Sequence, residues 1–382
     1  MPAPIYLDYN ASTPIAPEVL DAMTDAFRHA HGNALSTHAF GVAARAIVER
    51  ARGEVAAAVG AEADEIVFTS GGTESNNAAV HGVAEALASR GRHIVITAIE
   101  HASVEEASRA LEAHGWGVTR VPVDPGGSID PRAIESVIRP DTVLVSVMHA
   151  NNETGVVQPV AAAARAARAK GVLIHTDAAQ SLGKIRVHVR ELDVDLLTIA
   201  GHKLYAPQGI GALYIRRGTP FEPFLRGAGH QGNRRSGTES VALSAALGAA
   251  CALADRELEA RGRHLQEMRD RLERALRGLF PGLVVHGGES KRLPNTLYVA
   301  LPGLDANELL ARVQGLATGS GAACHSGSVT PSKVLLAMGV KPEIARATLR
   351  LTTGRETTAA EIDEAAVRLA AATRAPARSE PA

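Results

Sequence analysis

The chain has 382 residues, more than a single hydrophobic core usually supports, so we expect two domains. A hydrophobic share of 46% is enough for large cores, and a net charge of −1 gives no electrostatic reason to expect nucleic acid or a membrane as a partner. The two cysteines, Cys251 and Cys324, are too few for a disulfide framework, and neither a signal peptide nor an apolar run of the roughly 20 residues that a membrane helix needs is visible, so we expect a cytoplasmic protein.

The first part of the chain, up to about residue 240, alternates short apolar runs with longer segments of helical periodicity. Helical spacing covers residues 76–89, 103–114 and 160–170, and Ser103 with Glu106 fits a capping box that opens one of these helices. The apolar runs predict strands at residues 65–69, 93–97, 118–121, 143–147, 172–175, 196–199 and 211–215. This alternation predicts an α/β fold in which a mostly parallel seven-stranded sheet lies between layers of helices.

The rest of the chain has a second pattern. A long charged helix is predicted over residues 241–279, broken or bent near Gly248. It is followed by a strand at 295–300, a helix at 305–313, a Gly-rich stretch to Gly327, a helix from Pro331, a strand at 347–352 and a final helix. We therefore assign residues 16–255 to a large domain, residues 1–15 and 256–372 to a smaller α+β domain that carries Cys324, and residues 373–382 to a disordered tail.

Polar clusters follow several of the predicted strands. In "IVFTSGGTESNN", Gly71, Gly72 and Thr73 lie between a strand and a helix, where backbone N–H groups can bind a phosphate. The segment lacks the Lys-Ser/Thr pair of a nucleotide P-loop. Ligands of open α/β sheets bind beyond the carboxyl ends of the strands, so we expect one cleft to collect the polar residues there. These residues are Thr73, His101, Asn152, Asp177, Gln180, His202 and Lys203.

Taken singly, each of these residues has an ordinary structural explanation. The Gly-Gly-Thr turn can be a tight connection, His101 can cap a helix, Asp177 can cap the segment that follows it, and Asn152 can shape a turn. An isolated Lys203 is usually a solvated turn lysine. Cys251, inside an Ala-rich helix, is expected to be a small buried hydrophobe.

Taken together, they point to pyridoxal 5′-phosphate bound through a lysine. Lys203 interrupts two nearly apolar strands in "DLLTIAGHKLYAPQGIGALYI", and burying an ammonium without a partner is costly. A cofactor site explains this interruption. It combines the phosphate cup, the strand-end carboxylate of Asp177 and Lys203, which comes 26 residues after Asp177. Lys203 condenses with the cofactor aldehyde, and Asp177 keeps the pyridine nitrogen protonated so that the ring accepts electrons. We expect Lys203 to be the only lysine in this cluster.

The same residues belong to motifs that run through almost the whole chain: "YLDYNASTP", "VFTSGGTESNN", "EHASV", "NNETGVVQP", "HTDAAQSLGK", "GHKLYAPQGIGALYIRR", "RSGTES", "LPNT" and "GSGAACHSGSVTPSKVLLAMGV". In this order the motifs resemble those of the cysteine desulfurases and L-selenocysteine lyases, in the aminotransferase class V group of the fold-type I pyridoxal phosphate enzymes. "GAACHSG" and "TDAAQSLGK" look especially like the lyases. The spacing from Cys324 to Pro331 looks more like desulfurases with a long mobile Cys loop.

The resemblance implies how the cofactor phosphate is held. It places Gly72 and Thr73 on the phosphate, with His202 beside it. It also implies that Thr238, in "RSGT", reaches the phosphate of the neighbouring subunit, so that a homodimer shares its active sites. Many family members have a phosphate-binding serine where this chain has Ala200, so one hydroxyl contact is missing.

For the cofactor ring and the substrate, the resemblance implies a further set of contacts. His101 stacks on the ring and serves in proton transfer, Asn152 and Gln180 contact the ring and its 3′-oxygen, Asp177 pairs with the ring nitrogen and Lys203 binds the aldehyde. Arg350, in "ATLRLTTGR", clamps the substrate carboxylate through a bidentate fork, helped by Asn33. Residues 32–35 read Gly-Asn-Ala-Leu instead of the more usual Gly-Asn-Pro-Ser, which changes the local loop.

Cys324 decides the reaction. Glycines and serines surround it between Gly319 and Ser328, a composition that suits a mobile loop. As a thiolate nucleophile it takes sulfur from L-cysteine, releases L-alanine and passes the persulfide sulfur to an acceptor such as an iron–sulfur scaffold protein. L-Selenocysteine is the alternative substrate, and no metal site is expected.

Two other functions stay open. A pyridoxal phosphate aminotransferase on the same scaffold would leave Cys324 incidental and would not release sulfide. A non-enzymatic sulfur carrier would be a protein whose catalysis has decayed, and intact Lys203, Asp177 and Cys324 argue against it.

Overall fold

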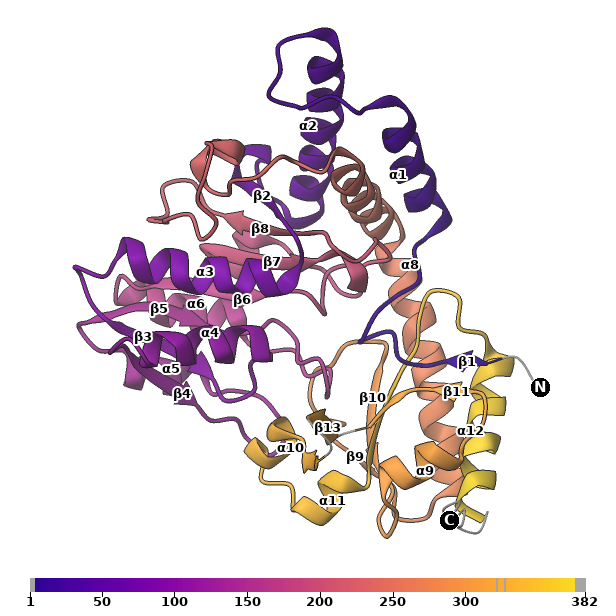
Figure 1. The fold of residues 1–382 in the computed structure, drawn as a ribbon. Coiled ribbons are helices and arrows are strands. Elements are labelled where there is room, and N and C mark those ends of the chain that lie inside the picture. The colour runs from indigo at the N-terminus through magenta and orange to yellow at the C-terminus, as the bar shows by residue number, and fades with distance from the viewer. Residues whose placement is uncertain (1–3, 321, 326–327, 375–382) are drawn as a thin grey trace.

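The computed structural model describes residues 4–320, 322–325 and 328–374. They form two units, each built around its own sheet, and helix α8 (Val241–Leu279) runs from one unit into the other (Figure 1). No helix in this described part of the chain is both long and apolar enough to cross a membrane. The cytoplasmic location stays a prediction.

The larger unit contains the predicted mostly parallel seven-stranded sheet. Its strand order is β2-β8-β7-β6-β5-β3-β4, and β8 runs antiparallel to both of its neighbours while the other adjacent pairs are parallel. The strands are β2 (Ile66–Thr69), β3 (His93–Thr97), β4 (Gly117–Val121), β5 (Thr142–Ser146), β6 (Leu173–Asp177), β7 (Leu196–Ala200) and β8 (Gly211–Ile215). The predicted α/β fold class is confirmed.

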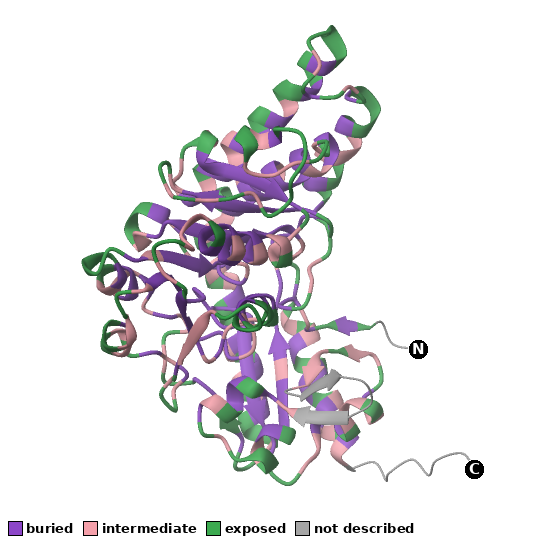
Figure 2. Ribbon diagram, turned by 60° about the vertical axis from the view of Figure 1, so that its left-hand side comes forward, coloured by how far each residue is buried: buried purple, intermediate pink, exposed green. Residues whose placement is uncertain are grey.

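Helices cover both faces of this sheet, because alternate side chains of a strand point to opposite faces. Val95 lies in one buried cluster, whereas its neighbours Ile94 and Ile96 lie in another. Figure 2 shows the buried sheet beneath helices whose outer faces are exposed. The helices of this unit are α1 (Pro17–His29), α2 (Ala39–Val59), α3 (Gly72–Ala86), α4 (Ala102–Glu112), α5 (Pro131–Val137), α6 (Val160–Ala169) and α7 (Val189–Leu192).

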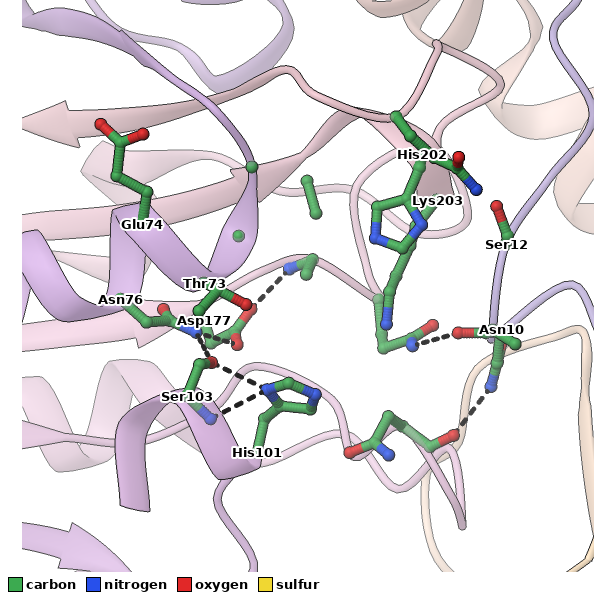
Figure 3. A pocket seen from close by; sticks show the side chains of 18 of the residues that line it. Asn10, Ser12, Thr73, Glu74, Asn76, His101, Ser103, Asp177, His202 and Lys203 are labelled. Carbon is green, nitrogen blue, oxygen red and sulfur yellow. Dashed lines mark hydrogen bonds between the residues drawn. The ribbon is translucent and has the colours of Figure 1, made fainter. Parts of the chain in front are cut away.

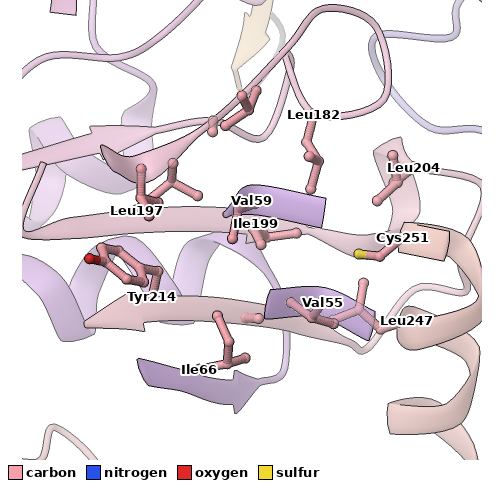
Figure 4. Close-up of a cluster of buried hydrophobic side chains, with 14 of the residues drawn as sticks. Val55, Val59, Ile66, Leu182, Leu197, Ile199, Leu204, Tyr214, Leu247 and Cys251 are labelled. Atoms are coloured by element: carbon pink, nitrogen blue, oxygen red, sulfur yellow. The ribbon is translucent and has the colours of Figure 1, made fainter. Parts of the chain in front are cut away.

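Cys251 lies on α8 in the first of these clusters, together with Val55, Leu204 and Leu247 (Figure 4). Its side chain is fully buried, and this burial raises the pKa of the thiol well above its ordinary value. The prediction that Cys251 is a small buried hydrophobe is confirmed. Of the two cysteines, only Cys324 is therefore left as a candidate nucleophile.

Two predicted details of the helices differ from the structure: the capping box is wrong, and α8 has no break near Gly248, while a bend there stays a prediction. The N-cap of α4 is His101, whose ring Nδ1 accepts a hydrogen bond from the Ser103 N–H at 3.2 Å, so Ser103 and Glu106 do not open the helix as a capping box. Helix α8 is one element of 39 residues that is unbroken at Gly248. A side chain at Gly248 would come within 2.7 Å of the Ala51 Cα on α2, so the glycine allows the two helices to pack closely.

The smaller unit is built on a four-stranded antiparallel sheet of order β12-β15-β10-β9. The N-terminal segment joins this unit, since β1 pairs with β11 and Leu7 lies in the same buried cluster as Leu351. The domain boundaries themselves stay a prediction. The elements are β1 (Ile5–Tyr6), β9 (Val284–Val285), β10 (Thr296–Ala300), α9 (Ala306–Arg312), β11 (Leu316–Ala317), β12 (Gly319–Ser320), α10 (Lys333–Ala337), α11 (Pro342–Arg346), β15 (Thr348–Thr352) and α12 (Ala359–Arg374).

Two boundaries differ from the sequence predictions. Pro331 ends a strand, and α10 begins at Lys333 because the Ser332 hydroxyl caps it by accepting the Leu335 N–H at 3.1 Å. Helix α12 continues to Arg374, so the first two residues of the predicted disordered tail at 373–382 are helical. The rest of that tail lies outside the described residues.

Candidate active site

A cavity of about 610 Å³ opens beyond the carboxyl ends of the parallel strands, within the size range of small-molecule sites (Figure 3). It brings together most of the predicted site residues, although they come from segments that are far apart in the sequence. The predicted residues that line it are Gly72, Thr73, His101, Asn152, Asp177, Gln180, His202, Lys203 and Arg350.

Lys203 is presented to this cavity by a short turn. Strand β7 ends at Ala200, and the 3-10 helix η2 (Gly201–Lys203) comes directly after it. The Thr13 hydroxyl holds the turn, since it donates to the His202 carbonyl at 3.0 Å and accepts the Tyr205 N–H at 2.8 Å. Tyr205 has a φ of +65°, a left-handed conformation that is unfavourable for a bulky residue, so Thr13 stabilises a strained turn.

The Lys203 amine has no hydrogen-bond partner among the described residues. Burial lowers its pKa to about 8, because the interior disfavours the ammonium; the charge of Asp177 opposes this shift and that of Arg350 adds to it. The neutral amine is therefore a minor but readily accessible form at physiological pH. Neutral amines are the form that reacts with an aldehyde or accepts a proton.

Asp177 is fixed at the end of β6 by two donors. The Ala179 N–H donates to its Oδ1 at 2.9 Å, and the Asn76 side-chain amide donates to its Oδ2 at 2.7 Å. Asn76 comes from α3 and also donates to the Ser103 hydroxyl oxygen at 2.8 Å. Its own amide oxygen is buried without a partner among the described residues. These two donors fix the orientation of the carboxylate. A carboxylate accepts hydrogen bonds, so it suits a ligand atom that carries a proton.

His101 is linked to Asp177 through Ser103 and Asn76. The Ser103 Oγ lies 2.7 Å from its ring Nδ1, and the Ser103 N–H also points at Nδ1. A backbone N–H can only donate, so Nδ1 accepts and a neutral ring carries its proton on Nε2. Burial lowers the pKa of His101, and Lys203 lowers it further while Asp177 opposes the shift. We infer a neutral imidazole at neutral pH.

The phosphate cup predicted from "SGGT" lies at the start of α3. Gly71 is the N-cap of this 15-residue helix with φ +148°, a conformation that favours glycine. The backbone of Gly71 also lies against β8, where a Cβ at Gly211 would come within 2.7 Å of the Gly71 Cα. Ala200 lies beside the cup, with its methyl group 3.2 Å from the position of a Cβ on Gly72, so this position offers no hydroxyl to a phosphate.

Gln180 and Asn152 are held by Asn10, which lies in the N-terminal segment. The Gln180 amide donates to the Asn10 carbonyl at 2.9 Å, and the Asn10 side-chain amide donates to the Asn152 carbonyl at 3.2 Å. Asn151 shapes the loop before Asn152 and Glu153, because its Oδ1 accepts the Glu153 N–H at 2.9 Å. Asn152 was considered as the residue that shapes this turn, but Asn151 supplies the hydrogen bond that does so.

Arg350 reaches the cavity from β15. Its guanidinium donates to Asp8 at 2.8 Å and to the Asn152 carbonyl at 3.2 Å, while its buried Nε has no partner among the described residues. Gly319 on β12 pairs with Arg350, and a Cβ there would lie 3.3 Å from the Arg350 Nη2. The small residue at position 319 therefore leaves room for the guanidinium.

The segment around Cys324, which we expected to be a loop, has the backbone of a hairpin. Strand β13 (Ala322–His325) pairs with β14 (Ser328–Pro331), with Cys324 opposite Val329. The Cys324 side chain lies outside what the structure describes. Both ends of the hairpin are attached near the cavity: Gly319 pairs with Arg350, and the Ser332 hydroxyl donates to Glu153, which comes directly after Asn152.

Two predicted residues do not line the main cavity. Asn33 and Thr238 line a separate cavity of about 320 Å³ beside α1, and Asn33 is exposed, so within one chain it does not lie with Arg350. Thr238 also lines a small space that it shares with Ser70 and Gly209, which line the main cavity too.

Several residues that shape the site were not identified from the sequence. They are Asp8, Asn10, Thr13, Asn76, Ser103 and Lys184. The available signal was a polar side chain inside an apolar pattern, as for Asn76 on the buried face of α3. Lys203 is the lysine that lines the main cavity in the described part of the chain, and the Lys184 amine lies next to it, where it donates to Gln180 at 2.9 Å.

Comparison with known proteins agrees with this arrangement. The sequence model of the aminotransferase class V family matches residues 5–365. A protein named cysteine desulfurase IscS, from Dictyoglomus turgidum, is 41% identical over 361 residues, which cover 94% of this chain and 92% of that protein.

Two solved structures are also similar over nearly the whole chain. One, titled NifS-like protein, is 34% identical with a TM-score of 0.91 and covers 96% of this chain and 98% of its own. The other, titled SspA in complex with cysteine, is 32% identical with a TM-score of 0.82 and covers 93% of this chain and 100% of its own.

We predict that Asp177→Asn lowers the pKa of Lys203 below about 8, because it removes the negative charge that favours the ammonium. The measurement is the pH dependence of acylation of Lys203 in cofactor-free protein, followed by peptide mass spectrometry. The exposed Lys170 is the control, and its labelling profile should be the same in both proteins. An unchanged or higher midpoint for Lys203 would contradict the proposed coupling.

Proposed function

The chain belongs to the aminotransferase class V family, and from that membership we propose how it acts as a cysteine desulfurase: it converts L-cysteine to L-alanine and passes the sulfur, as a persulfide on Cys324, to an acceptor protein of iron–sulfur cluster assembly. One observation carries the proposal. A single cavity holds the unpartnered Lys203 amine, the oriented Asp177 carboxylate and the Arg350 guanidinium.

The cavity residues fit pyridoxal 5′-phosphate, and three features support this assignment. The start of α3 at Gly72 and Thr73 offers N–H groups and a positive helix end to a phosphate. Asp177 can keep a proton on the ring nitrogen, and the Lys203 amine is free to bond to the aldehyde. When bound, this cofactor acts as an electron sink for the bonds at the substrate α-carbon.

The protein residues then divide the work of proton transfer. With its amine free, Lys203 has a pKa of about 8, close to neutral pH, and would suit a base that removes the substrate α-proton. His101 presents an Nε2–H donor from a ring held by Ser103. The link from His101 through Ser103 and Asn76 to Asp177 keeps both side chains in fixed orientations.

Arg350 suits the carboxylate of an amino acid. Its planar guanidinium supplies paired donors, and its Nε–H has no partner among the described residues. Asp8 accepts from the Nη2 of this guanidinium at 2.8 Å and so helps to fix its plane. The loop at Asn152 supports the guanidinium from its carbonyl oxygen.

Cys324 is proposed as the nucleophile because its hairpin is rooted at the cavity. It comes four positions after Ser320 on β12, a reach of at most about 14 Å from the strand that pairs beside Arg350. Its thiolate bonds to the substrate sulfur, the carbon–sulfur bond breaks, and the electron pair stays on the carbon that becomes alanine after protonation. The persulfide sulfur then passes to a thiol of the acceptor protein.

We also propose a homodimer in which Thr238 serves the partner's site. Thr238 does not line the main cavity, whereas the surface beside it is apolar and open. Phe27 and Phe40 are 66% and 59% exposed there, on α1 and α2, which is unusual for a surface without a partner. A second copy of this chain would cover these rings and bring Thr238 and Asn33 to a complete site.

We predict that Cys324→Ala abolishes sulfide release from L-cysteine but leaves the visible spectrum of the bound cofactor intact, because the thiolate acts after the substrate has bound. We expect the variant to keep measurable cleavage of L-selenocysteine, since selenium leaves carbon more readily than sulfur. Sulfide, selenide and alanine are measured in parallel, with Cys251→Ala as the matched control that keeps its activity. Full desulfurase activity in Cys324→Ala would show that another group accepts the sulfur.

The shared-site proposal predicts complementation. Lys203→Ala and Thr238→Ala proteins, each with little activity alone, should regain part of the wild-type rate when their subunits are exchanged, because one of the two mixed sites has both residues intact. The rate is measured before and after exchange, and light scattering gives the oligomeric state. A fully active monomer would refute composite sites.

A further inference from the structure

Lys184 is a buried lysine that the proposed mechanism does not use. Its side chain is only 7% exposed and lies behind Gln180, away from the lining of the main cavity. The amine donates two hydrogen bonds, to the Gln180 Oε1 at 2.9 Å and to the Asn10 Oδ1 at 3.0 Å. No carboxylate contacts it among the described residues, and the charged groups that act on it are Lys203 and Arg350.

The protonation state agrees with these two contacts. Burial lowers the pKa of Lys184 well below its ordinary value, and the like charges of Lys203 and Arg350 lower it further. A neutral amine keeps two N–H donors, and the structure offers it two acceptor oxygens. The side chain is therefore satisfied as a neutral donor without any counter-ion.

The contacts of Gln180 with Lys184 and Asn10 determine which end of its side-chain amide is the oxygen and which is the nitrogen. One end of the amide lies 2.9 Å from the Asn10 carbonyl, which can only accept, so that end must be the nitrogen. The end that faces Lys184 is therefore the oxygen, and the Lys184 amine donates to it. Of the two Nε2 hydrogens, one is used by Asn10 and the other has no partner among the described residues, while Gln180 lines the cavity.

Asn10 is fixed in the same way. Its Oδ1 accepts from Lys184 and from the Asn295 amide, both at 3.0 Å, and its nitrogen donates to the Thr296 Oγ1 at 3.0 Å and to the Asn152 carbonyl. Lys184 thus helps to orient two side-chain amides, and the Gln180 amide is also held by the main-chain carbonyl of Asn10. Without its donors, both the Gln180 Oε1 and the Asn10 Oδ1 would lose a hydrogen bond in a buried site.

We propose that Lys184 is a positioning residue, which locks the Gln180 amide so that its free N–H donates to the ring oxygen of the bound cofactor. The proposal rests on the cofactor assignment made above and names a second lysine with a role separate from that of Lys203. A donor to that oxygen stabilises its deprotonated form, so the bound cofactor gives up its proton at a lower pH.

The test is a spectrophotometric pH titration of the holoenzyme without substrate. Lys184→Met keeps the length of the side chain but removes both donors, and it should raise the pH midpoint of the cofactor absorption by about half a unit to one unit. Gln180→Ala should raise the midpoint similarly, and Lys184→Met should add nothing in the Gln180→Ala background. Lys170→Met, at an exposed position, is the matched control with no shift.

An unchanged midpoint in Lys184→Met would overturn the proposal. The proposal would also be overturned if Lys184→Met shifted the pH midpoint equally in the wild-type and Gln180→Ala backgrounds. Such a result would show a general charge or packing effect. If Lys184→Met does not fold, nuclear magnetic resonance of the wild type decides: a locked Gln180 gives a pair of side-chain N–H signals protected from exchange with water, and a rapidly exchanging pair overturns the proposal. Failure of the cofactor assignment is distinguishable, because the wild type would then show no visible titration at all.

Discussion

The site depends on making the neutral form of the buried Lys203 amine accessible near neutral pH. A buried ammonium is costly, and the surroundings of Lys203 keep its pKa at about 8, where both forms are accessible. Asp177 and Asp8 favour the charged form, while burial and Arg350 disfavour it. This balance places the amine where it can bond to an aldehyde and then exchange a proton. The surrounding hydrogen bonds serve mainly to hold this amine and its neighbours in place.

The N-terminal segment joins the two units at this point. Leu7 belongs to the core of the smaller unit, whereas Thr13 clamps the turn of Lys203 in the larger one. Between them, Asp8 holds Arg350 and Asn10 connects Gln180 with Asn152. One short stretch of chain therefore reaches the lysine turn, the proposed substrate clamp Arg350 and the proposed ring contacts Gln180 and Asn152. A substitution in this segment would disturb all three without touching a reacting atom.

Periodicity and strand ends are the features that the sequence predicts well. All seven strands of the larger sheet were found, since each is a short apolar run between polar turns, and Asp177, Asn152 and His101 were found because they come directly after such runs. The capping box failed because a histidine side chain can supply the same acceptor as a serine. Asn76 and Lys184 could not be predicted, because their partners come from segments that only the fold brings near. Asn33 and Thr238 do not line the main cavity of the single chain, and their roles rest on the proposed second subunit.

The central claim is that Lys203, and not the neighbouring Lys184, carries the cofactor. Purified protein with pyridoxal 5′-phosphate is reduced with borohydride, digested and mapped by mass spectrometry, which locates the lysine that bears the fixed label. The account predicts label on the peptide that contains Lys203 and none on the peptide that contains Lys184, because only the Lys203 amine lines the cavity and lacks a partner among the described residues. Label on Lys184, or no fixed label on either lysine, would contradict it.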